Sequence, residues 1–334
     1  MRAAWYERRG TPREVLVVGE TADPTPAEGE VRIALTVSGV NPGDVKKRAG
    51  WQGSPMPYPR VIPHSDGAGT IDAIGPGVSV DRVGERVWCY GAQSYRPFGT
   101  AAEYVVVPSA LAVTLPEQPV ASGGDDLDEQ ASCLGIAGIT AHRAIFADGS
   151  VRGLVVLVHG AAGGVGSIAT QLARRGGAEV VAVVRNEEQL ARAQRLGADH
   201  AFRADEADLG ERIRRIAPGG VHRIAEVDLA GHVDLDSDIL AVGGVISSYS
   251  SSADRTAIPY WPLGFKDTTL RLLGSDDFSP AVKAEAARDL TDALIDGGLR
   301  SDIAARFALE DIASAHELVE AGPPGRVVID LLAP

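Results

Sequence analysis

Short apolar runs separated by Gly, Pro and Asp fill the first 115 residues of the chain. Each run has the length of one β-strand, and the runs cover residues 15–20, 31–40, 67–75, 86–90 and 102–107. Because strand-length runs bounded by turn residues are typical of antiparallel sheets, we predict a mainly-β, barrel-like domain in this part of the chain.

From about residue 150 the pattern alternates between apolar strands and amphipathic helices. Strand-like runs at 154–159, 179–184 and 222–229 alternate with helical patterns such as 168–175 and 187–196. This alternation predicts βαβ units in a doubly wound parallel sheet, so the fold class is α/β.

The segment 116–130 is rich in Pro, Gly and acidic residues, and we place a domain boundary near 126. After the parallel region come a long helical pattern at 281–298, the segment 306–322 and a last strand at 326–332. The hydrophobic pattern alone does not assign this tail to either domain.

Composition and charge agree with two domains in a reducing cytoplasm. The chain has 334 residues, 45% of them apolar, and a formal net charge of −13, which repels nucleic acid and anionic lipid. Cys89 and Cys133 form no CxxC pair, so we expect neither a disulfide framework nor a thiolate zinc site. The N-terminus becomes charged early, and His159 and several glycines interrupt the span Leu154–Ala173. We therefore expect no secretory signal and no membrane span.

The stretch HGAAGGVG, residues 159–166, joins a predicted strand to a predicted helix. Glycines permit a tight turn and the close approach of a pyrophosphate, and a helix N-terminus offers free N–H groups and a positive dipole end. A second strand ends at Val184, as a dinucleotide fold requires. We therefore predict a dinucleotide site, with a purely structural turn as the alternative. The predicted contacts are Gly160, Ala161, Ala162, Gly163, Gly164 and Val165.

The end of that second strand indicates which dinucleotide binds. Val184 offers no acceptor for a ribose diol, whereas Arg185 offers a planar cationic fork suited to a 2′-phosphate. A charge-assisted contact worth about 1.5–3 kcal/mol favours NADP(H) over NAD(H) roughly tenfold to a hundredfold. We predict NADPH as the cofactor, with Asn186 and Arg203 as further contacts; solvated surface arginines are the alternative.

Further motifs lie at residues 39–50, 64–69, 139–146 and 325–332. Together with the glycine loop, in this order along nearly the whole chain, they resemble the medium-chain dehydrogenase/reductase superfamily, and in particular its zinc-free quinone oxidoreductase (zeta-crystallin-like) branch. The resemblance implies a GroES-like catalytic domain of residues 1–125 and 271–334 and a Rossmann NADP(H)-binding domain of residues 126–270. It also implies an active site in the cleft between the domains and a homodimer.

In zinc alcohol dehydrogenases of the superfamily three side chains hold the catalytic metal, and the matching positions here are Asn41, Ser65 and Ile136. An amide, a hydroxyl and an isoleucine do not suit tetrahedral zinc, so we expect no metal and interpret the neighbouring His64 as a loop or core histidine. Without a Lewis acid, an unactivated ketone has little to stabilise a developing oxyanion. Quinones and conjugated enones are already electron-poor, and they are the substrates that we expect.

Asn41 matches the branch's active-site asparagine, which implies an amide that hydrogen-bonds a substrate oxygen or the nicotinamide ribose; an Asn-Pro turn is the alternative. Pro42 is a predicted cofactor contact beside it. Asp44 and Lys46 follow on a short helical turn, where Lys46 is suited to stabilise an anion or donate a proton. A plain surface ion pair is the alternative for these two residues.

The remaining candidates come from the resemblance and from aromatic character. Trp51 and Tyr58 are possible stacking residues for the substrate, with packing as the alternative. Relatives carry tyrosines at the positions of Lys46 and Gln52, so the substrate pocket implied here is less aromatic. The sequence therefore supports a quinone substrate less firmly than an activated carbonyl compound in general. The other predicted contacts are Thr140, Ser248 and Arg326 for the cofactor and Tyr249 for the substrate. We expect core or interface packing for His142, with a proton relay as the alternative, and a structural hydrogen bond for His159.

These features predict an NADPH-dependent, zinc-independent reductase that transfers hydride to quinones. Reduction of activated alkenes is the alternative, and it differs because a proton must reach carbon, whereas a quinone oxygen can take one from water. A non-catalytic NADPH-binding protein is the second alternative. The expected partners are a small-molecule substrate and a second copy of the chain, with neither nucleic acid nor membrane.

Overall fold

The computed structural model describes residues 1–50, 53–116 and 127–333, and the chain divides into two compact units. Unit 1 comprises Met1–Ala137 and Ser279–Pro334, and unit 2 comprises Gly138–Phe278. The predicted division at 126 and 270 lies earlier in the chain at both points. The first difference arises because the helix Leu127–Ala131 is buried against the strands of unit 1.

Unit 1 is built on a seven-stranded sheet in which one long strand, Glu30–Val40 (β3), pairs with three others. Val31, Ile33 and Leu35 alternate with more exposed residues along β3 and face the core, as expected for a half-buried strand. The other six strands of this sheet are β4 (Asp66–Ile74), β5 (Arg86–Cys89), β6 (Tyr104–Pro108), β7 (Ala112–Thr114), β14 (Ile303–Ala308) and β15 (Arg326–Asp330). Strands β1 (Arg2–Trp5) and β2 (Val17–Glu20) pair with each other in a separate two-stranded sheet. This arrangement confirms the predicted mainly-β, GroES-like domain.

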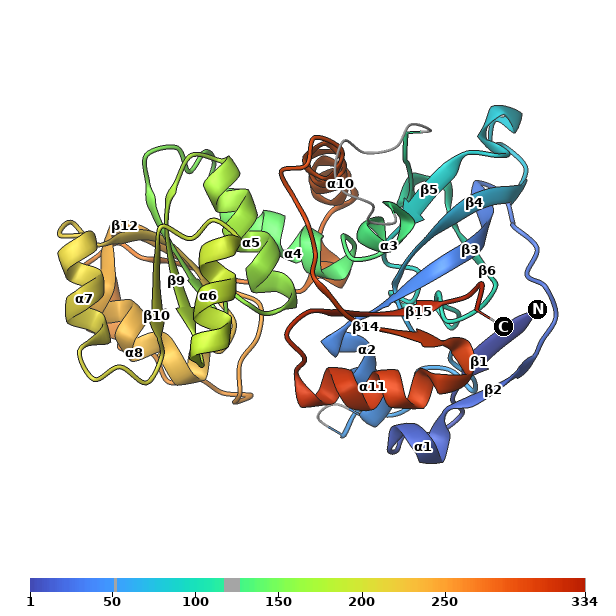
Figure 1. Cartoon of the computed structure of the whole chain (residues 1–334), viewed down its shortest axis with the longest axis horizontal. Coiled ribbons are helices and arrows are strands. Elements are labelled where there is room, and N and C mark those ends of the chain that lie inside the picture. The colour runs from blue at the N-terminus through green and yellow to red at the C-terminus, as the bar shows by residue number, and fades with distance from the viewer. Residues whose placement is uncertain (51–52, 117–126, 334) are drawn as a thin grey trace. The chain divides into compact units, whose positions relative to one another are not determined.

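The C-terminal tail completes unit 1. Strand β15 pairs antiparallel with β3, and helix α11 (Ile312–Ala321) packs against β14 and β15 (Figure 1). The other helices are α1 (Pro12–Val15), α2 (Pro42–Ala49), α3 (Leu127–Ala131) and α10 (Pro280–Ile295). Helix α2 has Asn41 as its N-cap and Pro42 in its first turn, and it ends at Gly50, which adopts a left-handed φ of 89°.

Unit 2 is a six-stranded parallel sheet in the order β10-β9-β8-β11-β12-β13. Its strands are β8 (Val155–His159), β9 (Glu179–Val184), β10 (His200–Arg203), β11 (Val221–Glu226), β12 (Leu240–Ser248) and β13 (Thr269–Leu272). The strand order reverses direction between β8 and β11, which makes this the ligand-binding switch point of a Rossmann sheet. The predicted doubly wound sheet is therefore confirmed.

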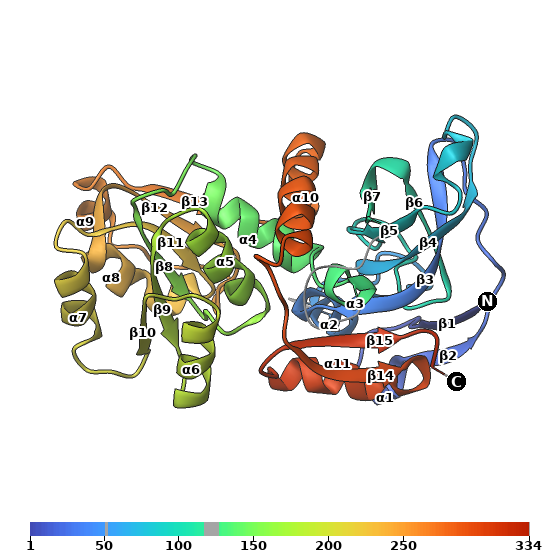
Figure 2. The ribbon, with the colours of Figure 1, turned by 45° about the horizontal axis from the view of Figure 1, so that its top comes forward.

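Helices cover both faces of this sheet, with α5 and α6 on one face and α7 and α8 on the other (Figures 1 and 2). Because both faces are covered, the strands are almost continuously apolar; in β9, Val180 to Val184 are all buried. The helices are α4 (Ile136–Phe146), α5 (Gly164–Arg175), α6 (Glu187–Arg195), α7 (Leu209–Ile216), α8 (Leu229–Ile239) and α9 (Tyr260–Gly264). No helix among the described residues is both long and apolar enough to cross a bilayer.

Candidate cofactor site and catalytic residues

The predicted glycine loop leaves β8 at the switch point of unit 2. Gly160 adopts a φ of 62°, which a residue without Cβ reaches at little cost, and its N–H donates to Val183 O at 2.9 Å. The N–H of Gly163 donates back to Gly160 O at 2.8 Å and closes the turn. A Cβ on Gly166 would overlap the carbonyl oxygen of Gly160, so only glycine allows the helix to start so close to the strand.

Helix α5 begins at Gly164 without a side-chain cap from the described residues, because its N-cap is Gly163. The first hydrogen bond of the helix runs from Ser167 N–H to Gly163 O at 2.9 Å. The N–H groups of Gly164, Val165 and Gly166 therefore lack helical acceptors and lie at the positive end of the helix dipole. Such a cradle fits the diphosphate of a dinucleotide.

Arg185 follows β9 and Arg203 is the last residue of β10, so both lie at the carboxyl ends of adjacent strands. Arg203 pairs in register with Val184, directly before Arg185. Arg185 is exposed, and its guanidinium makes no hydrogen bond or ion pair with the described part of the chain. Arg203 lies 2.9 Å from Asp205 and 3.1 Å from Glu187, which are exposed pairs that cost little to break. Asn186 caps α6 by accepting from Gln189 N–H at 2.9 Å.

Three further predicted contacts lie in unit 2. Thr140 is buried on α4, and Ser248 ends β12, where its hydroxyl donates to Ser250 O at 2.9 Å. The N–H of Tyr249 donates to Glu226 O at 3.0 Å, and burial raises the pKa of its phenol. The predicted packing of His142 is confirmed, since it is buried beside Phe146. Ligand contacts by Thr140, Ser248 and Tyr249 stay predictions.

A buried polar cluster lies where β8 and β11 end. His159 Nε2 lies 2.8 Å from Asp236 Oδ1, which confirms the expected structural hydrogen bond, and His232 Nδ1 lies 2.9 Å from Glu226 Oε1. Burial lowers the pKa of His159 to about 4 and raises that of Asp236 to about 7. The hydrogen bond to Glu226 instead raises the pKa of His232, so the two histidines of this cluster shift in opposite directions.

Residues His159, Glu226 and His232 offer possible metal-ligand atoms within 4.8 Å of one another. The two imidazole rings, however, are stacked with centroids 4.3 Å apart and planes inclined by only 14°. A metal ion lies near the plane of each imidazole that binds it, and two stacked rings do not share such a point. The arrangement suits hydrogen bonding and ring stacking rather than a metal.

Unit 1 brings together four of the polar side chains near one end of β3. Asn41 Nδ2 donates to Asp66 Oδ2 at 2.7 Å, Arg326 donates to Asn41 Oδ1 at 2.8 Å, and Asn41 N–H donates to Asp44 Oδ2 at 2.8 Å. All four residues are buried. Strand register explains the cluster, because Gly39 pairs with Asp66 and Val40 pairs with Val327. We call Asn41, Asp44, Asp66 and Arg326 the Asn41 cluster.

Asp66 is the member that the sequence did not single out. Its Oδ2 also accepts from Ile136 N–H at 2.9 Å, and a Cβ at Gly135 would overlap its carboxylate. The sequence offers one hint, which is that the acidic residue Asp66 stands directly before the uncharged run GAGT. The side chain of Asn41 and the backbone of Ile136 thus both donate an N–H to the carboxyl group of Asp66. N–H donors cannot serve as zinc ligands, so this arrangement does not fit a catalytic zinc.

The other predicted residues of unit 1 are less closely joined. Lys46 is exposed on α2, and Tyr58 is half-buried, with its hydroxyl donating to Tyr95 O. Trp51 lies outside the described residues. His64 is buried as predicted, with Nε2 2.9 Å from His316 Nε2. Arg326, which the resemblance places near cofactor phosphates, has its guanidinium directed to Asn41, and its cofactor contact stays a prediction.

The Asn41 cluster predicts that stability falls as pH rises. Burial raises the pKa of Asp66 to about 7 and that of Asp44 to about 6, from an ordinary 3.8, and Asp44 adds to the shift at Asp66. The folded state therefore holds more protons between about pH 4 and 7, and the free energy of unfolding decreases through that range. At about 1.4 kcal/mol per pKa unit, Asp66 alone accounts for up to about 4 kcal/mol. The free energy of unfolding in urea, measured at pH 4.5 and at pH 8, should differ less between the two pH values in Asp66→Asn than in wild type. An equal difference in the two proteins would contradict the raised pKa of Asp66.

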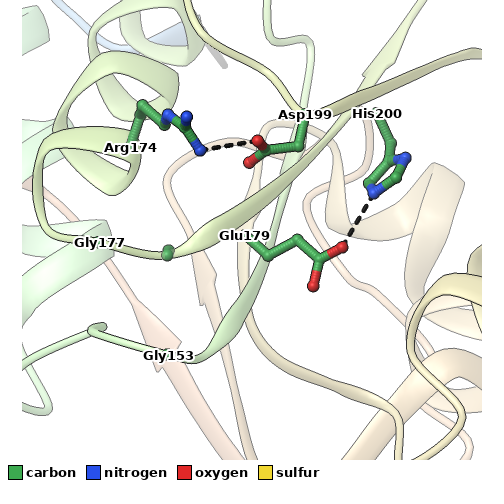
Figure 3. A pocket seen from close by; sticks show the side chains of 7 residues that line it. Gly153, Arg174, Gly177, Glu179, Asp199 and His200 are labelled. Atoms are coloured by element: carbon green, nitrogen blue, oxygen red, sulfur yellow. Dashed lines mark hydrogen bonds and ion pairs between the residues drawn. The ribbon is translucent and has the colours of Figure 1, made fainter.

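A cavity of about 510 Å³ lies elsewhere in unit 2 (Figure 3). Its lining residues are Gly153, Arg174, Gly177, Ala178, Glu179, Asp199 and His200. Glu179 and His200 begin β9 and β10, so the cavity lies at the amino ends of the strands. Dinucleotides bind at the carboxyl ends, which separates this cavity from the glycine loop.

Comparisons with known proteins agree with the geometry. The family model for the alcohol dehydrogenase GroES-like domain matches residues 27–117, and that for zinc-binding dehydrogenase matches residues 164–287. Quinone oxidoreductase from Rattus norvegicus is 30% identical, over 98% of this chain and 97% of its own. A 2-haloacrylate reductase from Burkholderia sp is 29% identical over 94% of each chain.

Among solved structures, a mycobacterial protein complexed with NADPH has a TM-score of 0.83 and 28% identity, covering 98% of this chain and 99% of that one. The sequence similarity and the two-domain fold extend over nearly the whole chain. The chain therefore belongs to the medium-chain dehydrogenase/reductase superfamily, in its zinc-free quinone oxidoreductase branch.

Proposed function

We propose that this chain reduces quinones with NADPH and without a catalytic metal. The chain is a reductase of its branch, and NADPH, when bound, supplies a hydride. The observation that carries the proposal is the uncapped start of α5 directly after β8, where three amide N–H groups remain for a diphosphate.

In unit 2 the residues bind and orient the cofactor. The loop from Gly160 to Val165 holds the diphosphate, and Arg185, with Arg203 beside it, takes the 2′-phosphate. The charge-assisted contact selects NADPH because NADH carries a hydroxyl in place of that phosphate.

In unit 1 the residues bind the acceptor. Asn41 donates an Nδ2–H to a substrate oxygen, and the exposed Lys46 contributes a positive charge from the last turn of the helix that Asn41 caps. These groups supply orientation and modest charge stabilisation, which is sufficient for an electron-poor acceptor.

The test is NADPH oxidation with a panel of quinones, enones and 2-haloacrylates. We expect turnover with quinones at higher kcat/KM than with the alkenes. Turnover of alkenes alone would favour the alternative, which the similarity to a 2-haloacrylate reductase supports. NADPH binding without oxidation by any acceptor would favour a non-catalytic role and overturn the proposal.

Replacing Arg185 by Gln tests cofactor choice. We expect kcat/KM for NADPH to fall about tenfold to a hundredfold, the equivalent of about 1.5–3 kcal/mol, with little change for NADH. Arg195→Gln removes an exposed arginine from α6 and serves as the control. Equal losses for NADPH and NADH in Arg185→Gln would assign Arg185 a role other than phosphate recognition.

We further propose a homodimer. Strand β13 is the last in the order of the unit 2 sheet, and α9 next to it in sequence exposes Tyr260 and Trp261, at 68% and 67%, followed by Phe265 at 80%. Exposed aromatic groups of this size are typical of association surfaces. Light scattering should give twice the 34.8 kDa chain mass, and Trp261→Lys should reduce the measured mass to that of the monomer. A wild-type monomer would contradict the proposal.

We also propose a reducing, cytoplasmic location, which is supported by Cys89 and Cys133 as buried free thiols.

A further inference from the structure

The side-chain amide of Asn41 is held from both sides by buried polar side chains. Its Nδ2 donates to the Asp66 carboxylate at 2.7 Å, and its Oδ1 accepts from the Arg326 guanidinium at 2.8 Å. A flipped amide would place an NH₂ group against a guanidinium, which has only donors, and an oxygen against a carboxylate. One orientation of Asn41 is therefore strongly favoured.

The groups that hold Asn41 are themselves fixed. Asp66 begins β4, and its Oδ2 also accepts from Ile136 N–H at 2.9 Å. Gly135 leaves no room for a side chain beside the carboxylate. Arg326 begins β15 and is 4% exposed. Both groups are thus anchored to strands that flank β3, so neither follows a ligand.

We propose that Asp66 and Arg326 are positioning residues that orient Asn41, so that the second Nδ2–H has one fixed direction in which to donate to a substrate oxygen. The proposal rests on the function proposed above. Asp66 and Arg326 act through Asn41 and do not themselves touch the substrate.

A double-mutant cycle tests the coupling at saturating NADPH. We expect Asp66→Asn to lower kcat/KM for a quinone about tenfold, equal to about 1.4 kcal/mol, with the KM for NADPH unchanged. In an Asn41→Ala background the same change should have less than about a twofold effect, because the group that Asp66 orients is absent. Additive losses would overturn the proposal. Arg326→Lys provides a second cycle should Asp66→Asn fail to fold.

A second readout does not depend on activity. The wild-type chain contains two asparagines, Asn41 and Asn186, so ¹⁵N-asparagine labelling gives two side-chain NH₂ groups. Asp66→Asn and Asp128→Asn each add a third NH₂ group, which comparison with the wild-type spectrum identifies. Asn41 is 1% exposed, whereas Asn186 is exposed and caps α6. We expect slow hydrogen exchange for Asn41 in wild type and faster exchange with shifted resonances in Asp66→Asn, while Asn186 stays unchanged.

Asp128→Asn is the matched control, because Asp128 is another buried carboxylate of unit 1 and bonds Thr36 and Arg86 instead. It should leave both kcat/KM and the Asn41 resonances unchanged. Asn41 resonances that do not respond to Asp66→Asn would refute the positioning role. A wild type that oxidises no NADPH would refute the proposed function, and the resonances would still decide whether Asp66 orients Asn41.

Discussion

Replacement of Gly166 by valine is expected to abolish NADPH binding. A Cβ at this position would overlap the carbonyl oxygen of Gly160 and lie 3.0 Å from Ala161 Cα. Because both are backbone atoms of the loop, α5 or the loop must move, and the first-turn N–H groups move with them. We expect the Kd for NADPH to rise at least about a hundredfold, or about 3 kcal/mol, in a fluorescence titration.

Gly219→Val is the control for this substitution, because an added Cβ there meets nothing within 4 Å in the same unit. Far-UV circular dichroism should show that both variants retain the wild-type secondary structure. A Gly166→Val protein that is folded and binds NADPH with wild-type affinity would show that the diphosphate is not held by this turn.

Truncation of Trp88 to alanine should cause the largest loss of stability in unit 1. Trp88 is fully buried on β5, and its Nε1 donates to Thr291 Oγ1 on α10 at 3.0 Å. The change removes a large side chain and a hydrogen bond that joins the tail to the N-terminal sheet, so we expect a loss of about 3–5 kcal/mol. Chemical unfolding followed by circular dichroism measures it.

Trp88→Phe helps to separate packing from hydrogen bonding, since it keeps most of the apolar volume and removes the Nε1 donor. We expect about 1–3 kcal/mol for this variant, including the part of the cost that comes from smaller volume. Equal stability of Trp88→Ala and wild type would mean that the contact of Trp88 with α10 does not stabilise unit 1.

Local patterns in the sequence predicted the elements that form the cofactor site. The run 179–184 coincides with β9, and the apolar run before His159 and the glycines after it predicted β8, the loop and the start of α5. Each of these elements is determined by residues that are close together in the sequence, so a local pattern is sufficient to predict it. The short strands β10 and β13 were not recognised, because each spans only four residues and contains polar side chains.

The Asn41 cluster depends on contacts that no local pattern contains. Asn41 meets Asp66 across 25 residues and Arg326 across 285 residues, through the register of β3 with β4 and β15. Asn41 was predicted from a resemblance, whereas Asp66 was missed because an acid in an apolar run gives no indication of its partner. The boundary predicted near 126 differs from the division between the compact units after Ala137 for a similar reason, since the burial of α3 depends on strands far away in sequence.

The most direct test of the metal-free mechanism is quinone-dependent NADPH oxidation by chelator-treated protein whose metal content is measured in the same sample. We predict that kcat is unchanged when zinc is far below one equivalent per chain. Loss of activity on chelation, with recovery at one equivalent of zinc, would contradict the account.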